Sequence, residues 1–154
     1  MENNLLEGKI FDWGCGYGYD LDYFRSKGFI TEGWDPVHRP DTPPDKYIPG
    51  SFNWVHCASV LNTLPNPDER LKILLDIYNF LPPLGNLSLT VRSQGELNSR
   101  IKPTWIKYSD GWITAKETFQ KGYLPKELVE IIAPLFKEII VIAKTPLFVI
   151  ARRR

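Results

Sequence analysis

The sequence has few cysteines, no long apolar run and no excess of one charge. Its two cysteines, Cys15 and Cys57, form no CxxC pair, which argues against a zinc site or a disulfide framework. No apolar run approaches the ~20 residues of a membrane helix, and no signal-peptide pattern opens the chain. A formal net charge of +1 gives no overall field that demands nucleic acid or a membrane surface. These absences predict a cytoplasmic protein without a metal site.

Length and composition favour a single globular domain over residues 1–154. A domain typically has ~100–200 residues, and this chain has 154. Hydrophobic residues make up 43% of the chain and charged residues 24%, which is ordinary for a chain that buries a core.

The most informative stretch is Lys9–Asp20, which reads KIFDWGCGYGYD. A short apolar run leads to Asp12, and glycines then alternate at Gly14, Gly16 and Gly18. Alternating glycines keep side chains away, so that a ligand can approach the backbone where a strand turns into a helix. The pattern predicts a ligand-binding loop.

A second acid, Asp35, closes the next strand-like run, Ile30–Trp34. It lies seventeen positions beyond Gly18, where a carboxylate is well placed to accept hydrogen bonds from a ribose. The loop and this acid together indicate a cofactor that contains a nucleoside.

The loop does not fit a dinucleotide. Tyr19 stands where the G-x-G-x-x-G pattern has its last glycine, and no Lys or Arg lies between Trp13 and Phe24 to hold a phosphate. Nearby carboxylates, including Asp20 and Asp22, instead favour a cationic ligand such as an ammonium or a sulfonium. An NAD-linked oxidoreductase is therefore disfavoured.

At these residues the chain resembles the class I S-adenosylmethionine-dependent methyltransferases, whose first motif reads acid-x-Gly-x-Gly-x-Gly. In that family the loop holds the methionine end of the cofactor, and the acid after the second strand holds the ribose. The resemblance therefore implies S-adenosyl-L-methionine as the cofactor. The binding residues that it implies are Asp12, Gly14, Cys15, Gly16, Gly18, Asp35 and Pro36.

The run Phe52–Asn62 resembles the fourth-strand motif of the same enzymes, with Asn53 where an acid is usual. The resemblance implies contacts with the cofactor, mainly through backbone, at Cys57, Ala58 and Ser59; plain strand packing is the alternative. His56 precedes Cys57 and faces the other side of the strand, where a hydrogen-bonded core residue is a better interpretation than a catalyst. His38 is expected to be solvated.

Strand-like and helix-like segments alternate along the chain, which predicts a parallel sheet covered on both faces. We expect strands at 9–13, 30–34, 51–57, 87–91, 137–142 and 147–151, and helices at 20–27, 66–81 and 125–135. Residues 36–50 hold five prolines, so a loop replaces the helix after the second strand, with a short strand at 46–48 as an option. The fold class is α/β: a Rossmann-like class I methyltransferase fold. Its mostly parallel sheet has seven (or six) strands and an antiparallel C-terminal hairpin.

The clearest helix signal follows Asn66, which suits an N-cap, and Pro67, which suits the first helical position. Leucines and a tyrosine then repeat at helical spacing, which predicts an inner face made of Leu71, Leu74, Leu75, Tyr78 and Leu81.

The segment 93–123 is polar and aromatic, and we interpret it as a substrate-binding or lid segment beyond the carboxyl end of the sheet. The chain here resembles the putative methyltransferases associated with DNA phosphorothioation gene clusters. The matching residues are Leu61, Asn62, Pro67, Glu69, Arg70, Thr118, Phe119, Gln120, Lys121 and Tyr123. An ordinary loop is the alternative for 118–121. As catalytic residues that position the acceptor we predict Asn62, Gln120, Lys121 and Tyr123.

The sequence thus predicts an S-adenosylmethionine-dependent methyltransferase whose acceptor is a small molecule or is linked to nucleic acid. The alternative is a non-catalytic cofactor-binding or partner module of a larger assembly. Many members of the family carry an extra helix before the first strand that covers the cleft, and this sequence has at most Asn4–Gly8 for that purpose. The cleft is then open, or it is closed by residues 93–123, by a second copy or by a partner subunit.

Overall fold

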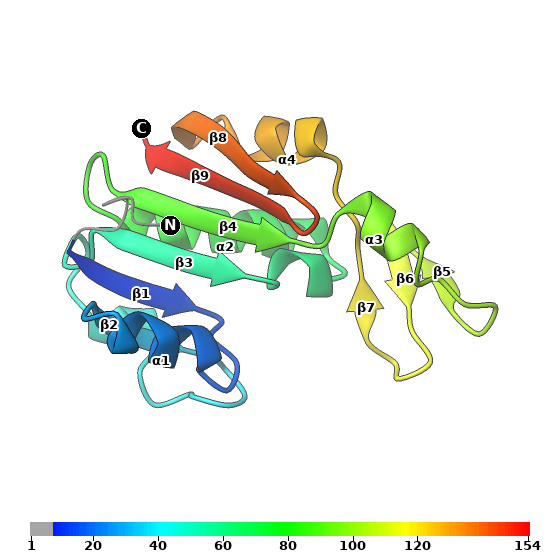
Figure 1. Ribbon diagram of the computed structural model, residues 1–154, viewed down its shortest axis with the longest axis horizontal. Helices are drawn as coiled ribbons and strands as arrows, with labels where there is room; N and C mark the ends of the chain where they lie inside the picture. Colours follow the sequence, from blue (N-terminus) through cyan, green and yellow to red (C-terminus); the bar gives the residue numbers. More distant parts are fainter. Residues whose placement is uncertain (1–7) are drawn as a thin grey trace.

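A six-stranded sheet forms the centre of the computed structural model, which describes residues 8–154 (Figure 1). The strand order is β2-β1-β3-β4-β9-β8, in which the first four strands pair in parallel and β9 pairs antiparallel with both β4 and β8. The strands are β1 (Lys9–Trp13), β2 (Ile30–Trp34), β3 (Trp54–Ala58), β4 (Asn86–Val91), β8 (Phe136–Lys144) and β9 (Leu147–Arg153). The predicted α/β class, the mostly parallel sheet and the antiparallel hairpin are confirmed.

Helices lie on both faces of this sheet (Figure 1). These helices are α1 (Tyr19–Ser26), α2 (Pro67–Phe80) and α4 (Pro125–Ile132), whereas the short α3 (Gln94–Asn98) lies beyond the end of β4. The 3₁₀ turns are η1 (Pro44–Lys46) and η2 (Leu61–Thr63). On the α1 side, Phe24 packs edge-on against His56 of β3. On the α2 side, Phe80 packs against Phe11 of β1 with ring centroids 4.8 Å apart. Because side chains alternate along a strand, Asp12 and His56 share the α1 face, and Phe11 belongs to the α2 face.

The loop between β2 and β3 contains no α-helix, as predicted. Its side chains Tyr47 and Phe52 pack against Phe11, with centroid distances of 5.4 and 5.2 Å. Aromatic rings thus cover the part of the sheet that a helix would otherwise cover. The optional strand at 46–48 is wrong, because η1 and an extended loop occupy this stretch. Prolines in the loop remove backbone donors that a strand would need.

The helix α2 begins where the sequence indicates, since the Asn66 side chain accepts a hydrogen bond from the Asp68 N–H at 2.9 Å. Its predicted inner face is partly wrong. Leu71 and Leu75 are exposed, and the residues that the helix buries are Arg70, Leu74, Ile77 and Phe80. The buried face is therefore rotated relative to the predicted one, and in its first turn it includes Arg70, which forms an ion pair with Asp110.

Residues 93–123 form more structure than the sequence suggests. After α3, a small antiparallel sheet joins β5 (Ile106–Tyr108), β6 (Gly111–Ile113) and β7 (Phe119–Gln120). Figure 1 shows these strands beyond the carboxyl ends of β3 and β4, which is where the sequence places a substrate or lid segment.

The segment Asn4–Gly8 lies outside the described residues except for Gly8. Among residues 8–154, no helix has the length and apolar character needed to cross a membrane.

Candidate functional site

The loop after β1 lies at the carboxyl edge of the sheet and is held by β2. The backbone N–H groups of Gly14 and Cys15 both donate to the Trp34 carbonyl oxygen, at 2.8 and 3.0 Å. Gly14 has a φ of +72°, and a Cβ there would lie 2.5 Å from Cγ2 of Val60. Glycine is therefore required both by the backbone conformation and by the packing.

Asp35 is joined directly to this loop. One carboxylate oxygen accepts the Gly16 N–H at 3.0 Å, and the other accepts the N–H groups of Val37 and His38 at 2.9 Å. Partial burial acts to raise the pKa of Asp35, but the donated hydrogen bonds outweigh it and lower the pKa below its ordinary value. The carboxylate stays ionised, and its two oxygens keep acceptor capacity for a further donor.

Arg39 supplies a cation that the local sequence of the loop lacks. Its backbone pairs with Asp35 in an isolated bridge, so that the chain turns back toward the loop. Its Nη2 donates to the Tyr17 carbonyl oxygen at 3.2 Å, and a Cβ on Gly18 would lie 2.7 Å from that nitrogen. The guanidinium group therefore covers the start of α1.

Two adjoining cavities open at this edge, and Gly14, Asp35 and Ser59 line both of them. The larger, about 460 Å³, has mostly apolar walls, among them Trp34, Pro36, Val60, Leu64 and Ile73. The smaller, about 370 Å³, has carboxylates from Asp12 and Asp20, with Tyr17, Tyr19 and His38 around them. One cavity thus suits a flat apolar group, and its neighbour suits a cationic group.

Asp12 is the most unusual group in the smaller cavity. Its side chain is only 2% exposed, and its Oδ2 has no hydrogen-bond partner among residues 8–154. Desolvation raises its pKa to about 6, although the nearby His56 acts in the opposite direction. A buried carboxylate oxygen without a donor is costly, so this atom points to a ligand that donates to it.

A polar chain crosses the α1 face beside Asp12. His56 contacts Ser88 through Nδ1 at 2.8 Å and Asp20 through Nε2 at 3.0 Å. The hydrogen bond from His56 is the main cause of the lowered pKa of Asp20. His56 is thus a hydrogen-bonded residue of the sheet face, as expected. His38 packs on Tyr17 with ring centroids 4.2 Å apart and is exposed.

Eight of the ten predicted cofactor-binding residues line the two cavities, and two do not. The structure brings to the cavities Asp12, Gly14, Cys15, Gly16, Asp35, Pro36, Ala58 and Ser59. Ser59 has a φ of +59°, an uncommon conformation for a serine that often occurs at ligand sites. Gly18 is buried beneath Arg39, and Cys57 lies fully buried in the core, because its side chain faces α2. Neither lines these two cavities.

The four predicted catalytic residues lie together, and none of them lines the cavities. Asn62, Lys121 and Tyr123 are buried, and Gln120 is half-buried. The Lys121 N–H donates to the Asn62 carbonyl oxygen at 2.8 Å, and the Asn62 side chain reaches Gln120 at 3.3 Å. The backbone bond of Lys121 and the side-chain bond between Asn62 and Gln120 thus attach β7 to η2, and none of the four residues lines the two cavities.

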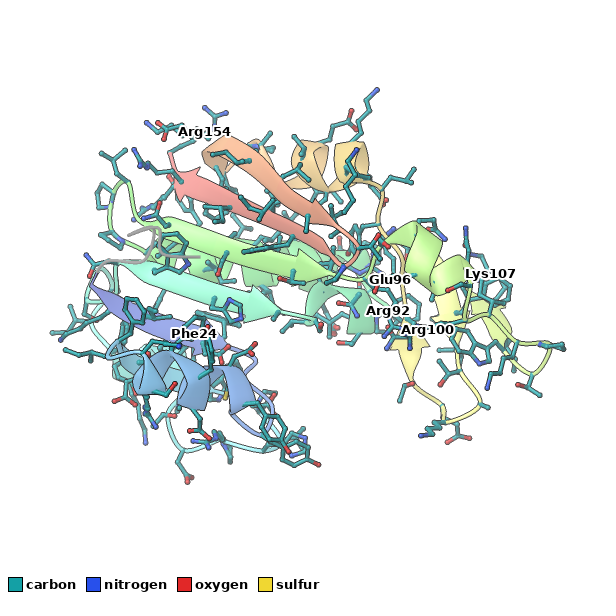
Figure 2. The ribbon with its side chains drawn as sticks, in the orientation of Figure 1. Phe24, Arg92, Glu96, Arg100, Lys107 and Arg154 are labelled. Atoms are coloured by element: carbon teal, nitrogen blue, oxygen red, sulfur yellow. The ribbon has the colours of Figure 1, made fainter. Side chains whose placement is uncertain are left out.

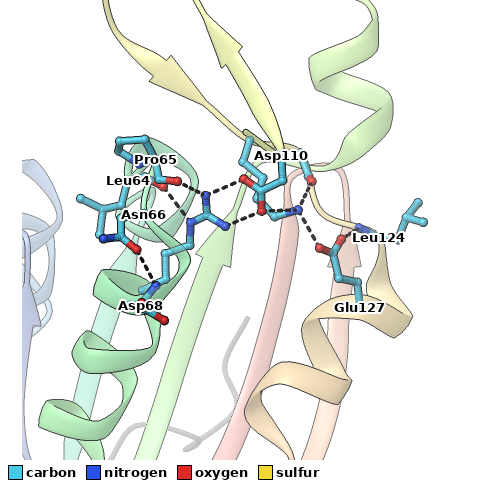
Figure 3. A network of polar contacts seen from close by, with 10 residues as sticks. Leu64, Pro65, Asn66, Asp68, Asp110, Leu124 and Glu127 are labelled. Atoms are coloured by element: carbon cyan, nitrogen blue, oxygen red, sulfur yellow. Dashed lines mark hydrogen bonds and ion pairs between the residues drawn. The ribbon is translucent and has the colours of Figure 1, made fainter. Parts of the chain in front are cut away.

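Figure 3 shows the anchor of the 93–123 segment, a network that joins α2, the small sheet and α4. Arg70 donates to both oxygens of Asp110 at 2.7 Å, and also to the carbonyl oxygens of Leu64 and Pro65. The Lys121 ammonium donates to Glu127 at 2.6 Å. These charges are paired within the chain. The pairing of Lys121 with Glu127 is not visible in the sequence motif, and the role of Lys121 toward the acceptor stays a prediction.

The fold and the site together define a Rossmann-like protein with two cavities at the carboxyl edge of its sheet, which is where proteins of this architecture hold nucleoside cofactors. A model of the methyltransferase domain family matches residues 2–117, so the chain belongs to that family. The predicted methyltransferase class is thereby confirmed, and S-adenosylmethionine is the cofactor that this class implies. A comparison with curated proteins gave no match.

Solved methyltransferases share the fold at low sequence identity. One from Methanosarcina mazei is 18% identical, with a TM-score of 0.73 over 97% of this chain and 95% of that chain. The 1,6-didemethyltoxoflavin-N1-methyltransferase of Burkholderia thailandensis is 18% identical, with a TM-score of 0.68 over 94% and 70%. An amino pentose methyltransferase from Micromonospora echinaspora is 15% identical, with a TM-score of 0.62 over 96% and 84%.

Proposed function

We propose that this chain transfers a methyl group from S-adenosylmethionine to a small-molecule acceptor, and that the two adjoining cavities hold the cofactor. The observation that carries the proposal is the unpartnered, buried Oδ2 of Asp12 in the smaller cavity. The ammonium of the methionine portion is a donor of the required charge. The residues present therefore fit the cofactor.

The remaining residues of the site support the same orientation. Asp35, held ionised by backbone donors, keeps free acceptor capacity for ribose hydroxyls. The apolar wall formed by Pro36, Val60 and Ile73 provides a surface for the adenine ring. We propose that Gly14, Gly16 and Ser59 approach the cofactor through their backbone.

The bound cofactor would supply a methyl group on a sulfonium, which needs no covalent help from the protein. The work left to the chain is to align the acceptor and exclude water, and alignment of this kind supplies ~7–11 kcal/mol of a barrier. The carboxylates of Asp12 and Asp20 favour the cationic state before transfer over the neutral state after it. This difference also favours the release of the demethylated product.

Calorimetry with S-adenosylmethionine and S-adenosylhomocysteine tests the proposal. We expect saturable binding of both to the unaltered chain and a loss of roughly tenfold or more in affinity for Asp12→Asn, because one charge-assisted hydrogen bond is removed. Asp22→Asn is the matched control, since Asp22 is exposed on α1 and lines neither cavity. Absence of binding by the unaltered chain would refute the proposal.

The nature of the acceptor is proposed from the relatives. The Burkholderia enzyme is named for 1,6-didemethyltoxoflavin and the Micromonospora enzyme for an amino pentose, and both acceptors are small molecules. An acceptor linked to nucleic acid remains a prediction. It depends on the resemblance to the enzymes of phosphorothioation gene clusters, which includes Asn62, Glu69 and Lys121.

A non-catalytic cofactor-binding module is the second candidate. It is favoured by the burial of Asn62, Lys121 and Tyr123, which removes from the cleft three residues that were expected to position an acceptor. A panel of amines, phenols and carboxylic acids, assayed with methyl-labelled cofactor, separates the two functions. Labelled product supports the enzyme, and tight cofactor binding without product over the whole panel supports the module.

A further inference from the structure

Arg92 is fixed at the carboxyl end of β4, beside the candidate active site. Its carbonyl oxygen accepts the Tyr123 N–H at 3.0 Å, and the Tyr123 carbonyl oxygen accepts the Gln94 N–H at 2.9 Å. Tyr123 is 1% exposed, so the backbone on both sides of Arg92 is attached to the core. The backbone from which the Arg92 side chain projects is therefore fixed.

The sheet places Arg92 on the same side as the cavity wall. Ala58, which lines the smaller cavity, pairs with Thr90 in the register of β3 and β4, and the Ser59 N–H donates to the Thr90 carbonyl oxygen at 2.8 Å. Side chains alternate along a strand, and the alternation of burial continues past the end of β4, where Val91 and Ser93 are buried and Arg92 is half-buried. Thr90 thus lies one strand spacing of ~4.8 Å from Ala58, and Arg92 follows two residues, or ~6.6 Å, further along the chain on the same face.

Within residues 8–154 the Arg92 side chain has no ion pair, although it is half-buried. The nearest acid in sequence, Glu96, is engaged by the N–H and hydroxyl of Ser93. Arg70 differs, since two carbonyl oxygens and a carboxylate satisfy its guanidinium group. A guanidinium group that is partly withdrawn from water and lacks an anion is suited to bind one.

A second guanidinium group occurs nearby in the sequence. Arg100 follows α3, is exposed, and takes part in no ion pair among the described residues. Figure 2 shows Arg92 and Arg100 at the end of the molecule where β4 meets α3 and the small sheet, and Arg154 at the opposite end.

We propose that Arg92, with Arg100 in support, binds an anionic group of the methyl acceptor, either a carboxylate or a phosphate. The proposal rests on the proposed function and names its acceptor class. The planar fork of a guanidinium group matches both anions through paired hydrogen bonds. The carboxylates of Asp12 and Asp20 then face the cationic cofactor, and Arg92 faces the anionic acceptor. Each ligand thus binds beside side chains of the opposite charge, at a different position along the carboxyl edge of the sheet.

The test uses benzoate, phenyl phosphate and the neutral analogue benzamide as probes, titrated by calorimetry into the chain saturated with S-adenosylhomocysteine. We expect at least one anion to bind and benzamide to bind at least tenfold more weakly. Arg92→Gln should weaken the bound anion roughly tenfold or more, Arg92→Lys should weaken it less, and Arg100→Gln should have a smaller effect. Arg154→Gln is the control and should change nothing.

The outcomes separate the two proposals. Preference for benzoate or for phenyl phosphate shows whether the acceptor anion is a carboxylate or a phosphate. If S-adenosylhomocysteine binds but neither anion does, or if both anions bind Arg92→Gln as tightly as the unaltered chain, the anionic acceptor is refuted and the methyltransferase proposal stands. If Arg92→Gln weakens S-adenosylhomocysteine and leaves the anions unchanged, Arg92 serves the cofactor and the inference is wrong.

Discussion

The cleft formed by the two adjoining cavities and the anchor of the 93–123 segment differ in how their buried charged side chains are paired. In the anchor, Arg70 and Lys121 are buried, and each contacts a carboxylate at 2.6–2.7 Å. In the cleft, Asp12 is buried as deeply, and one of its oxygens has no donor among residues 8–154. A buried charge that the chain itself pairs contributes to the fold, and a buried charge that it leaves unpaired indicates a ligand.

The largest effect is expected in the anchor. Arg70→Met removes the partner of Asp110 and leaves the carbonyl oxygens of Leu64 and Pro65 without their donors, which should cost roughly 2–4 kcal/mol of unfolding free energy. Urea denaturation followed by circular dichroism measures it. Lys72→Met, which breaks an exposed pair with Asp76 on the same helix, should stay within about 0.5 kcal/mol. Equal losses in the two variants would contradict the contrast between a structural charge and a surface charge.

In the cleft, removing a buried charge should increase the free energy of unfolding of the free chain. Asp12→Asn replaces a carboxylate whose burial is unfavourable when it is ionised, so it should stabilise the free chain at pH 7 by about 1–2 kcal/mol. The same change should weaken the cofactor. Thermal unfolding with and without S-adenosylhomocysteine measures both effects. A variant that loses stability in the absence of ligand would show that Asp12 has a partner in the free protein.

A substitution in the glycine loop should have the next largest effect on stability. Gly14→Ala forces an alanine into a φ of +72° and places its Cβ against Val60, which should cost about 1–2 kcal/mol and weaken the cofactor. Gly95→Ala is the control, because a Cβ there meets no atom within 4 Å. Restored stability in Gly14→Ala combined with Val60→Ala would identify the contact, rather than the backbone, as the main cause.

The smallest expected effect is the pH dependence of the affinity for S-adenosylhomocysteine. Because the pKa of Asp12 is raised to about 6, the carboxylate becomes protonated as the pH falls from 7 to 5. Affinity for S-adenosylhomocysteine should then fall by up to about tenfold, while the contribution of Asp12 to the stability of the free chain rises over the same interval. The groups with lowered pKa values, Asp20, Asp35 and Asp110, lose their contributions only below about pH 4. Affinity that does not change between pH 7 and 5 would contradict the role of Asp12.

Local patterns predicted the parts of the fold that depend on nearby residues. The glycines from Gly14 to Gly18, the cap at Asn66 and the apolar runs of the sheet act within a few positions. The structure has the loop and the cap where they were expected, and the strands with ends shifted by up to three residues. The small sheet at 106–120 was not predicted, because strands of two and three residues are too short for a recognisable alternation.

The misplaced residues depend on partners far away in the chain. Arg70 pairs with Asp110 forty positions later, so a residue that looks solvated in the sequence is buried on the inner face of α2. Arg39 reaches Gly18 only because the chain turns back after Asp35. The motif that contains Gln120 and Lys121 joins the small sheet to η2 and α4, contacts that no local pattern shows, and its role toward an acceptor stays a prediction.

The most direct measurement of the central claim is a crystal structure of the chain with S-adenosylhomocysteine. We predict that its amino nitrogen lies within ~3.2 Å of Oδ2 of Asp12, and that its ribose hydroxyls contact Asp35. A nucleoside found elsewhere on the sheet, with the Asp12 oxygen still unpartnered, would contradict the account.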